Sequence, residues 1–594
     1  MAQRSNGFLI FVGLGLLLGL GYGRWFVGLV TSPVTQPGTE SVMAPSADRL
    51  LSDPFLQNPT AAGVSVVWFT EFAGDRHLVE YGDGLDQQQA AVTTQLSRIQ
   101  EDPSVGDDEA PRPPVSRPIW RHEATLTGLQ SGQRLPYRVV SIKDNRRIES
   151  DRFSLAPSPA AGAPLKILLT SDHQQKPMTP ANLQKVVETV GQVDAVFFAG
   201  DLVNVPDRAS EWFDQGGSFF RALQGRAEGE LTYGDVSTVY PGGAIIQSAP
   251  LFPAVGNHEV MGRVSERPLN DQFNDPVPRA IAAQRYEAQV SDINPQGDPA
   301  VREAWLKEQS FNIDTYQELF TLPEGSDGDK YYATTFGDVR LVSLYITNIW
   351  RTPDLNPGAR GRYRERDEDL TDPNQWGYGQ HIFEAVGPGS PQYEWLRQEV
   401  ASPQWQQARY RVVMFHHPPH SLGDNTVPAY SDPVQIIENL PDGSIKSVRY
   451  EYPQGQDYLT QHVLPLIEGA GAHLVFYGHN HIWNRFVSPA GVHYLETSNV
   501  GNSYGAAWKT NRRQIPLGFQ ENYPPLGDPN GLDPVMPSIS PLQDEDGELQ
   551  PFLASNEITA FSIFDTGQGT VSSYRFDTRQ PDSPVVKFDE FTLP

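Results

Sequence analysis

Hydrophobic and polar positions alternate along the first part of the chain. Alternation with a period of two is typical of half-buried β-strands. It recurs in four short segments separated by turn residues: Val64–Thr70, Leu78–Tyr81, His122–Leu129 and Tyr137–Ile142. This spacing predicts an all-β sandwich domain over residues 53–157. We expect the polar, acidic stretch 87–118 within it to be a surface insertion.

The pattern changes after Pro157-Ser-Pro159, where compact apolar runs alternate with helical periodicity. Leu165–Thr170 and Asp194–Ala199 are predicted strands. Between them, Thr179 and Pro180 are expected to begin a helix, with the threonine as N-cap and the proline at the first helical position. Strand, helix and strand in succession predict a parallel sheet in an α/β domain.

Further elements of the same kind extend this domain over residues 163–594. Ser390-Pro391 is predicted to begin a helix, and strands are expected at Tyr410–Phe415, Leu474–Tyr477, Phe561–Phe564 and Val571–Phe576. The last two segments are predicted to be closing antiparallel strands. Insertions at roughly 205–250, 261–330, 350–388 and 505–555 are too long for ordinary connections and are candidates for loops that shape a substrate site.

The N-terminal residues 1–30 are strongly apolar. Phe8–Gly23 carries no charge, Arg24 interrupts, and Trp25–Val30 is apolar again. We expect a single membrane helix that anchors the chain, and a cleaved signal peptide is the alternative. Residues 31–52 are predicted to be a flexible stalk. Both alternatives place the remainder outside the cytoplasm, in the periplasm or at the cell exterior, or secrete it if the segment is cleaved.

Charge and cysteine content narrow the possible functions. A formal net charge of −27 disfavours binding to a nucleic-acid polymer through phosphate contacts. A small phosphate ester could still bind where bound metal ions outweigh the negative charge of the protein. Because the 594 residues include no cysteine, thiolate metal sites and cysteine nucleophiles are excluded. Any metal must be held by His, Asp, Glu, Asn or Gln.

Five polar clusters directly follow apolar runs. They are Ser171–Gln174, Gly200-Asp201, Gly256–Glu259, His416–Pro418 and Gly478–His481. The carboxyl ends of strands line the ligand crevice of open α/β sheets, so these clusters are expected to converge. Seven of the 13 histidines lie in or beside the clusters, which core packing would not produce.

Each cluster also has a purely structural interpretation. A lone aspartate after a strand is often a helix N-cap, and Gly-Asp is a common turn. Gly478-His479-Asn480-His481 is more specific, because histidines at positions i and i+2 beside a glycine can reach two ions at once. Five clusters in this order make coincidence improbable.

The order of these motifs resembles the calcineurin-like metallophosphoesterase superfamily. Within it the chain is most similar to the purple-acid-phosphatase branch, whose fibronectin-type-III-like N-terminal domain resembles the segments around Trp68, Tyr81 and His122. The resemblance implies an α/β catalytic domain, a four-layer β-sandwich flanked by helices, with two divalent metal ions, Mn, Fe or Zn.

The resemblance also implies a role for each matched position. Asp201 would bridge both ions, Asp172 and His481 would complete the first site, and Asn257, His416 and His479 would complete the second. His258 would be the catalytic acid, with a hydroxide between the ions as nucleophile. Asn257, His173 and His420 are weaker candidates for substrate binding.

Two positions depart from the pattern of the family. Gln174 stands where a histidine ligand is usual; its amide oxygen can bind a metal, and we retain it as a candidate ligand. Asn204 stands where the purple enzymes have a tyrosine, so no tyrosinate colour is expected. His173 is adjacent to Asp172 rather than two residues away, and we expect it to point elsewhere, toward substrate.

The leading hypothesis is an exported, metal-dependent hydrolase of phosphomonoesters. One alternative is a phosphodiesterase that acts on nucleotides or lipid head groups, because the same metal centre cleaves both kinds of ester. A second alternative is a non-catalytic envelope scaffold or adhesion protein. A non-catalytic protein is expected to have lost some of the metal-binding residues, whereas the six matched ligand positions and His258 all carry the residue type of the family.

Overall fold

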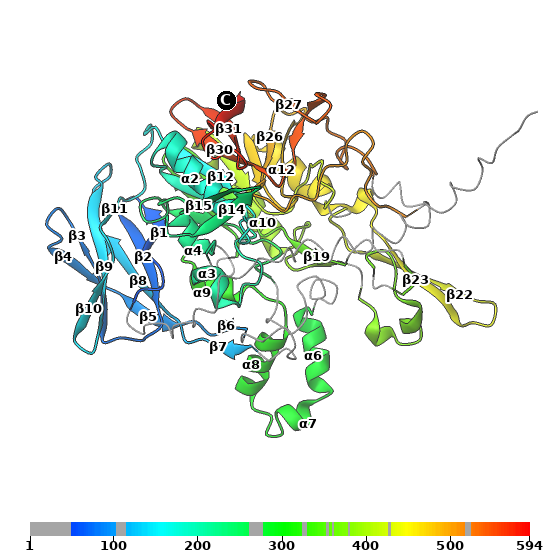
Figure 1. Cartoon of the computed structure of the whole chain (residues 1–594). Helices are drawn as coiled ribbons and strands as arrows, with labels where there is room; N and C mark the ends of the chain where they lie inside the picture. Colours follow the sequence, from blue (N-terminus) through cyan, green and yellow to red (C-terminus); the bar gives the residue numbers. More distant parts are fainter. Residues whose placement is uncertain are drawn as a thin grey trace, which may run out of the picture. The chain divides into compact units, whose positions relative to one another are not determined.

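The computed structural model describes ten stretches of the chain (Figure 1): residues 49–102, 114–214, 216–260, 277–323, 330–351, 356–358, 361–377, 380–425, 429–516 and 524–594. Residues 48–594 form one compact unit. The predicted membrane segment 8–30, and the predicted stalk up to residue 48, lie outside the described residues. Within the described ranges, no helix is both long and apolar enough to cross a membrane.

The first part of this unit consists of two antiparallel sheets. One has the order β1-β2-β8-β5, and the other has the order β10-β9-β3-β4 with β11 beside β9. Inward-facing side chains of both sheets form one buried cluster, which includes Val66, Trp68, Val79 and Val139. The predicted β-sandwich is therefore present. Its strands are β1 (Phe55–Thr60), β2 (Gly63–Thr70), β3 (Arg76–Tyr81), β4 (Gln87–Ala90), β5 (Val92–Gln95), β8 (Trp120–Thr127), β9 (Leu135–Lys143), β10 (Arg146–Glu149) and β11 (Phe153–Leu155).

The polar stretch 87–118 is only in part the surface loop that the sequence predicts. Its first nine residues form β4 and β5, which pair with β3 and β8 at the edges of the two sheets. Both strands are largely exposed, so their polar composition suits an edge position. A short pair, β6 (Gln100–Glu101) and β7 (Val115–Ser116), follows.

The second part is built on two larger sheets. The six-stranded sheet has the order β16-β13-β12-β30-β31-β32, in which β12, β13 and β16 are parallel. The seven-stranded sheet has the order β17-β18-β21-β24-β26-β25-β29. The strands of the first are β12 (Lys166–Thr170), β13 (Ala195–Phe198), β16 (Leu251–Pro253), β30 (Ile558–Asp565), β31 (Thr570–Asp577) and β32 (Val586–Thr592). Those of the second are β17 (Tyr332–Phe336), β18 (Val339–Ser343), β21 (Tyr410–Met414), β24 (Leu474–Tyr477), β25 (Trp483–Val487), β26 (His493–Thr497) and β29 (Phe552–Leu553).

The two sheets pack face to face with helices outside them. Successive residues of the seven-stranded sheet point into different cores. Val412 belongs to the core shared with the six-stranded sheet, whereas Val413 belongs to the core shared with Leu396 and Ile467 of the covering helices. Helix α2 contributes Leu183 and Val186 to the core of the six-stranded sheet. The order helix, sheet, sheet, helix is the predicted four-layer arrangement. The covering helices are α2 (Thr179–Val190), α10 (Pro391–Glu399), α11 (Pro403–Gln407) and α12 (Leu464–Gly469).

Of the two predicted helix N-termini, that of α10 agrees with the structure and that of α2 does not. At α10 the prediction is confirmed: the Ser390 hydroxyl accepts a hydrogen bond from the Tyr393 N–H, and Pro391 begins the helix. At α2 the predicted cap is wrong, since Met178 is the N-cap and Thr179 is already helical. The Thr179 hydroxyl instead donates to the carbonyl of His173, 3.2 Å away, and so ties the helix to the loop after β12.

The long insertions carry secondary structure of their own. Trp212 and Phe220, from the insertion after β13, belong to the same core as Phe55 and Phe69 of the β-sandwich. The elements that lie between the strands of the two larger sheets include α3 (Ala209–Phe213), α4 (Phe219–Leu223), β14 (Gly229–Tyr233), β15 (Val236–Tyr240), α6 (Arg279–Glu287), α7 (Val290–Ile293), α8 (Pro299–Gln309), α9 (Asp314–Leu319), β19 (Asn348–Trp350), β20 (Gln380–Ile382), β22 (Val434–Asn439), β23 (Ile445–Glu451), β27 (Leu542–Gln543) and β28 (Leu549–Gln550).

Candidate metal centre

Five polar segments meet at one edge of the two central sheets. Asp172 follows β12, Asp201 follows β13 and Asn257 follows β16, all in the six-stranded sheet. His416 follows β21 and His479 follows β24 in the seven-stranded sheet. The strands within each group are parallel, so their carboxyl ends lie at the same edge. The predicted convergence of the five clusters is present.

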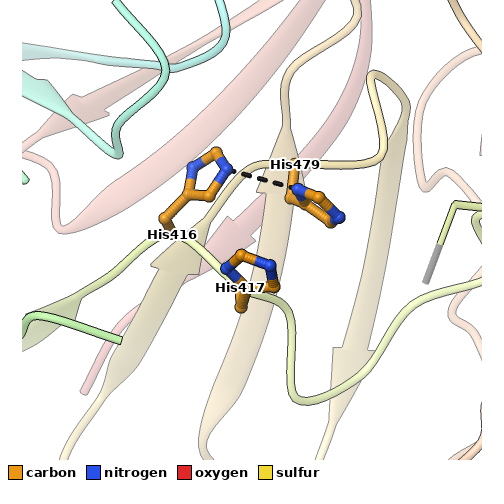
Figure 2. A group of neighbouring side chains, drawn as sticks. All are labelled: His416, His417 and His479. Carbon is orange, nitrogen blue, oxygen red and sulfur yellow. Dashed lines mark hydrogen bonds between the residues drawn. The ribbon is translucent and has the colours of Figure 1, made fainter. Parts of the chain in front are cut away.

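One half of the site is rich in imidazole. His416 Nε2 lies 2.9 Å from Asn257 Oδ1 and 3.2 Å from Asp201 Oδ2. His479 Nδ1 lies 3.2 Å from the same Asn257 oxygen and 3.3 Å from His416 Nε2 (Figure 2). Four potential ligand atoms therefore converge, from the residues predicted for the second ion.

The other half contains the residues predicted for the first ion. His481 Nε2 lies 3.4 Å from Asp172 Oδ1, and that buried oxygen has no hydrogen-bond partner among the described residues. Gln174 Nε2 lies 2.9 Å from Asp201 Oδ2, so the amide contacts the carboxylate predicted to bridge the two ions. Asp172, Asp201 and His416 offer ligand atoms within 4.8 Å of one another.

Backbone carbonyls hold the histidines in definite orientations. His416 Nδ1 lies 2.8 Å from the Ala199 carbonyl, His481 Nδ1 2.7 Å from that of Asn502, and His479 Nε2 3.2 Å from that of Asn425. A carbonyl can only accept, so each of these ring nitrogens donates. The other nitrogen then faces the centre, where it can bind a metal ion once it carries no proton.

The loops that carry these ligands adopt strained backbone conformations. Asp172, Asp201, His479 and His481 have φ of 58°, 57°, 87° and 57°, in the left-handed region that residues with a Cβ avoid. Gly478 is required for packing, because a Cβ there would overlap Ser171 Oγ and Asp172 Oδ2. Such strain is maintained only where surrounding contacts enforce it, and it is common at functional sites.

Glu259 supplies such contacts. Its buried carboxylate accepts hydrogen bonds from the backbone N–H groups of Asp201, Leu202 and Gly256, at 2.7–2.8 Å. Burial, followed by the charge of Asp201, raises its pKa to about 8, and the three donors oppose this shift by stabilising the carboxylate. Glu259 therefore joins the loops after β13 and β16 without contributing a ligand atom to the centre.

The charges of the side chains favour a cation at the centre. Burial opposes ionisation of Asp201, yet the charges of His416 and His258 lower its pKa to about 2. Burial likewise opposes the charge on His416, but Asp201 raises the pKa of His416 to about 9. Burial is the largest single effect on Asp172 and opposes its ionisation, but nearby His481 and the charges of His416 and Lys176 together lower its pKa. A positive charge held among these groups is strongly stabilised.

His258 occupies a different place from the ligands. Its backbone N–H donates to Asp201 Oδ1 at 3.0 Å, and its Nδ1 donates to the Asn204 carbonyl at 2.7 Å. Nε2 is 3.8 Å from Asp201 Oδ2, at the border of the centre. The ring thus stands beside the bridging carboxylate, where the sequence places the acid.

Two of the three weaker substrate-binding candidates, His173 and His420, do not reach the centre. His173 Nε2 bonds to Thr170 Oγ1 at 2.9 Å, and the ring packs edge-on against Phe198 in the core. His420 Nδ1 pairs with Asp528 Oδ2 at 2.7 Å, and the ring packs against Tyr494. The expectation that His173 faces substrate is therefore wrong, and His420 has a local partner that explains its burial.

Two residues of the site have no role predicted from the sequence. His417 is fully buried, stacks on His479 with ring centroids 4.3 Å apart, and has no hydrogen bond at either ring nitrogen within the described part of the chain (Figure 2). Lys176 is 4% exposed, and its amino group also has no hydrogen-bond partner there. His417 belongs to the predicted cluster His416–Pro418, whereas nothing in the sequence marks Lys176.

The donor set fits two divalent ions. Neutral imidazoles, two carboxylates and an amide oxygen suit borderline ions such as Mn²⁺, Fe²⁺ or Zn²⁺. The atoms that would hold them are Asp172 Oδ1, which has no hydrogen-bond partner among the described residues, and the inward ring nitrogens of His416, His479 and His481. Asp201 lies between the two halves of the centre, where its carboxylate could bind the ion of each half.

Comparison with known proteins agrees with this geometry. The sequence profile of the calcineurin-like phosphoesterase family matches residues 165–483, more than half of the chain. The chain therefore belongs to the calcineurin-like phosphoesterase family, a class of phosphoric ester hydrolases with a dinuclear metal centre. The predicted superfamily, enzyme class and metal requirement are confirmed.

Similar solved structures include a purple acid phosphatase from yellow lupin (Lupinus luteus) seeds. Its identity to this chain is 14%, with a TM-score of 0.49, and the match covers 91% of this chain and 74% of the lupin chain. GAP50, the anchor in the inner membrane complex of Plasmodium, is 10% identical with a TM-score of 0.28, covering 72% and 89%. A dimetal phosphatase from Danio rerio is 12% identical with a TM-score of 0.28, covering 72% and 99%. No curated protein matches the chain.

Proposed function

We propose that this chain hydrolyses phosphomonoesters outside the cytoplasm. The observation that carries the catalytic part is the convergence of Asp172, Asp201, Asn257, His416, His479 and His481, with His258 beside them. When bound, the two ions would neutralise phosphoryl oxygens and acidify a water molecule for in-line attack.

The side chains of the protein contribute position and proton transfer. Asn257 lies between His416 and His479, where its amide can also contact a phosphate oxygen. His258 keeps Nδ1 on the Asn204 carbonyl, which leaves Nε2 as the atom that can protonate the leaving oxygen. Its pKa is lowered mainly by burial, although Asp201 opposes this shift, so a proton on Nε2 is readily given up.

The enclosure of the centre supports a monoester as the substrate. All six predicted ligands are nearly inaccessible to solvent, and Trp350 packs edge-on against His479, with ring centroids 4.8 Å apart. A monoester has one organic substituent that must find room, whereas a diester has two. Three non-bridging oxygens can also use more donors than the two of a diester.

The test compares paired substrates that share a leaving group. Metal-loaded protein covering residues 49–594 should hydrolyse 4-nitrophenyl phosphate with a kcat/KM at least about tenfold above that for bis(4-nitrophenyl) phosphate, the ratio expected for about 1.4 kcal/mol of differential transition-state binding. Preference for the diester would favour the phosphodiesterase alternative. Metal binding without hydrolysis of either ester would favour the scaffold alternative.

We also propose the export of the catalytic part, on the basis of the apolar segment 8–30. The full-length protein should fractionate with membranes, and protease added outside the cytoplasm should digest the catalytic part. A soluble external form that begins near Thr31 would instead indicate a cleaved signal peptide. Full protection inside intact cells would contradict both versions.

A further inference from the structure

Lys176 is a buried amine without a partner. Its residue is 4% exposed, and Nζ has no hydrogen bond or ion pair with any residue that the structure describes. Leaving a buried donor without an acceptor costs about 1–3 kcal/mol, and more for a charged group. Such a group is therefore expected to meet an acceptor other than the residues that the structure describes.

The backbone fixes the position of this lysine. The Lys176 N–H donates to the His173 carbonyl at 2.7 Å, and the Lys176 carbonyl accepts from the Thr179 N–H at 3.0 Å, directly before α2. Gln174 and Gln175, which precede it, have φ of 40° and 54°. After this strained turn, the Lys176 Cβ lies close to Gly501, in the loop whose Asn502 carbonyl accepts a hydrogen bond from His481.

The electrostatic neighbours of Lys176 belong to the centre. After burial, the charge of Lys176 is the main cause that lowers the pKa of His481, and it also contributes to the lowered pKa of His258. Conversely, burial lowers the pKa of Lys176 to about 7 against the opposing charges of Asp172 and Asp201. The amine therefore lies close enough to Asp172 and Asp201 to feel their charges, and it forms no hydrogen bond with either carboxylate.

We infer that the Lys176 amino group donates a hydrogen bond to a non-bridging oxygen of the substrate phosphate. This assignment rests on the proposed function and makes Lys176 a substrate-binding residue of the same site. Both the neutral amine and the ammonium form can donate, so the contact does not depend on the protonation state. A phosphate oxygen suits this donor, because it is a hydrogen-bond acceptor that carries negative charge.

The experiment uses Lys176→Met, which keeps the length of the side chain and removes its donor. Lys185→Met is the matched control: Lys185 lies in α2, and its amine pairs with Glu188 2.7 Å away, outside the centre. The probe is inorganic phosphate, whose binding to metal-loaded protein is measured by calorimetry. Bound metal is quantified by elemental analysis, and thermal stability is recorded on the same samples.

Lys176→Met should bind phosphate about 10- to 100-fold more weakly than wild type, as expected for the loss of one hydrogen bond to a charged ligand. Metal content should be unchanged, and the Tm should be equal or higher because a buried amine without a partner is gone. A merely structural lysine would instead give a lower Tm, and Lys185→Met should leave phosphate binding unaltered.

Equal phosphate affinity in Lys176→Met and wild type would overturn the inference while leaving the proposed function intact. Loss of metal together with phosphate would also overturn it, because Lys176 would then support the metal site rather than the substrate. If metal-loaded wild type binds no phosphate and hydrolyses no ester, the proposed function itself fails, and the inference fails with it.

Discussion

At the scale of single residues, the histidines proposed as metal ligands and the candidate acid differ in what their ring nitrogens contact. His416, His479 and His481 each donate one nitrogen to a backbone carbonyl and turn the other toward a carboxylate, an amide oxygen or a neighbouring imidazole. His258 also donates to a carbonyl, but its Nε2 is 3.8 Å from the nearest Asp201 oxygen. This difference separates ligands from a residue that acts on substrate.

His258→Ala should therefore separate chemistry from metal binding. We expect both ions to be retained while kcat falls by about 10²- to 10⁴-fold, the usual contribution of general acid catalysis. The decrease in kcat should be smaller for nitrophenyl phosphates than for alkyl phosphates, because a good leaving group needs no proton. The measurement is kcat across esters of graded leaving-group acidity, with elemental analysis of each sample.

Asp201→Ala serves as the comparison for this variant. It should lose metal and activity together, because Asp201 is placed between both halves of the centre. If His258→Ala lost metal in the same way, or if its defect were independent of the leaving group, the assignment of His258 as the acid would be wrong.

The protonation of His416 predicts how metal affinity depends on pH. Asp201 raises the pKa of His416 to about 9, so at neutral pH in the metal-free protein Nε2 carries a proton. An ion that uses this nitrogen has to displace the proton, so raising the pH removes a competitor and strengthens binding. Between pH 6 and 8 the affinity should rise about tenfold per pH unit for one released proton.

Calorimetry in buffers with different ionisation enthalpies measures this proton release directly. Close to one proton per ion is expected at the His416 half of the centre, and the number should decrease as the pH approaches 9. Binding that releases no proton at pH 7 would show that His416 is not a ligand.

Asn204 predicts the colour of the protein. It stands where the purple enzymes have a tyrosine, and its Nδ2 donates to the Gln174 carbonyl at 2.7 Å, away from the ligand atoms. The active protein should therefore have no strong visible absorption band. A tyrosinate-to-iron charge-transfer band in freshly purified protein would mean that another tyrosine enters the centre.

At the scale of elements, the loops after the central strands hold the ligands in place. Glu259 connects the loops after β13 and β16 through three backbone N–H groups. Glu259→Ala would leave these buried donors without an acceptor, at about 1–3 kcal/mol each. We expect a clearly lower Tm together with weaker metal binding, although Glu259 offers no ligand atom to the centre.

Glu188→Ala is the matched control, because Glu188 is a partly exposed glutamate of α2 whose pairs with Lys185 and Gln184 are local. It should change stability by no more than about 0.5 kcal/mol. Thermal unfolding and metal titration are measured on both variants. Wild-type metal affinity in Glu259→Ala would show that the loops keep their shape without this glutamate.

Elements with a strong apolar pattern could be predicted, and those without one could not. β12, β13 and β24 are buried runs of Val, Ile, Leu and Phe, and their predicted positions agree with the structure to within a residue at each end. β4 and β5 were missed because exposed edge strands have no apolar period. The cap of α2 was misassigned because the Thr179 hydroxyl bonds to His173, a tertiary contact that local sequence does not encode.

The same limit applies to the residues of the site. Asp201, Asn257 and His479 could be predicted because each lies in a short motif directly after a strand. Lys176 and Glu259 could not be assigned roles, because their importance depends on what they face in three dimensions. His173 was expected near substrate from its place beside Asp172, but the positive φ of Asp172 sends the two side chains to different sides.

At the scale of the whole molecule, the site is assembled from segments that lie far apart in sequence. Asp172 and His481 are more than 300 residues apart, yet they meet because two sheets pack face to face with their parallel strands ending at one edge. The insertions between these strands add helices and hairpins without separating the ligands. The β-sandwich joins the same unit through the aromatic core around Phe55 and Phe220.

The central claim is that this assembly is a two-metal phosphoesterase, and one titration tests it most directly. Metal-free protein covering residues 49–594 is titrated with Mn²⁺ or Zn²⁺ while bound metal and hydrolysis of 4-nitrophenyl phosphate are followed on the same samples. We expect two ions per chain, full activity only when both are bound, and loss of activity on chelation. Hydrolysis by protein that holds no metal, or binding that saturates with both sites filled and no hydrolysis, would contradict it.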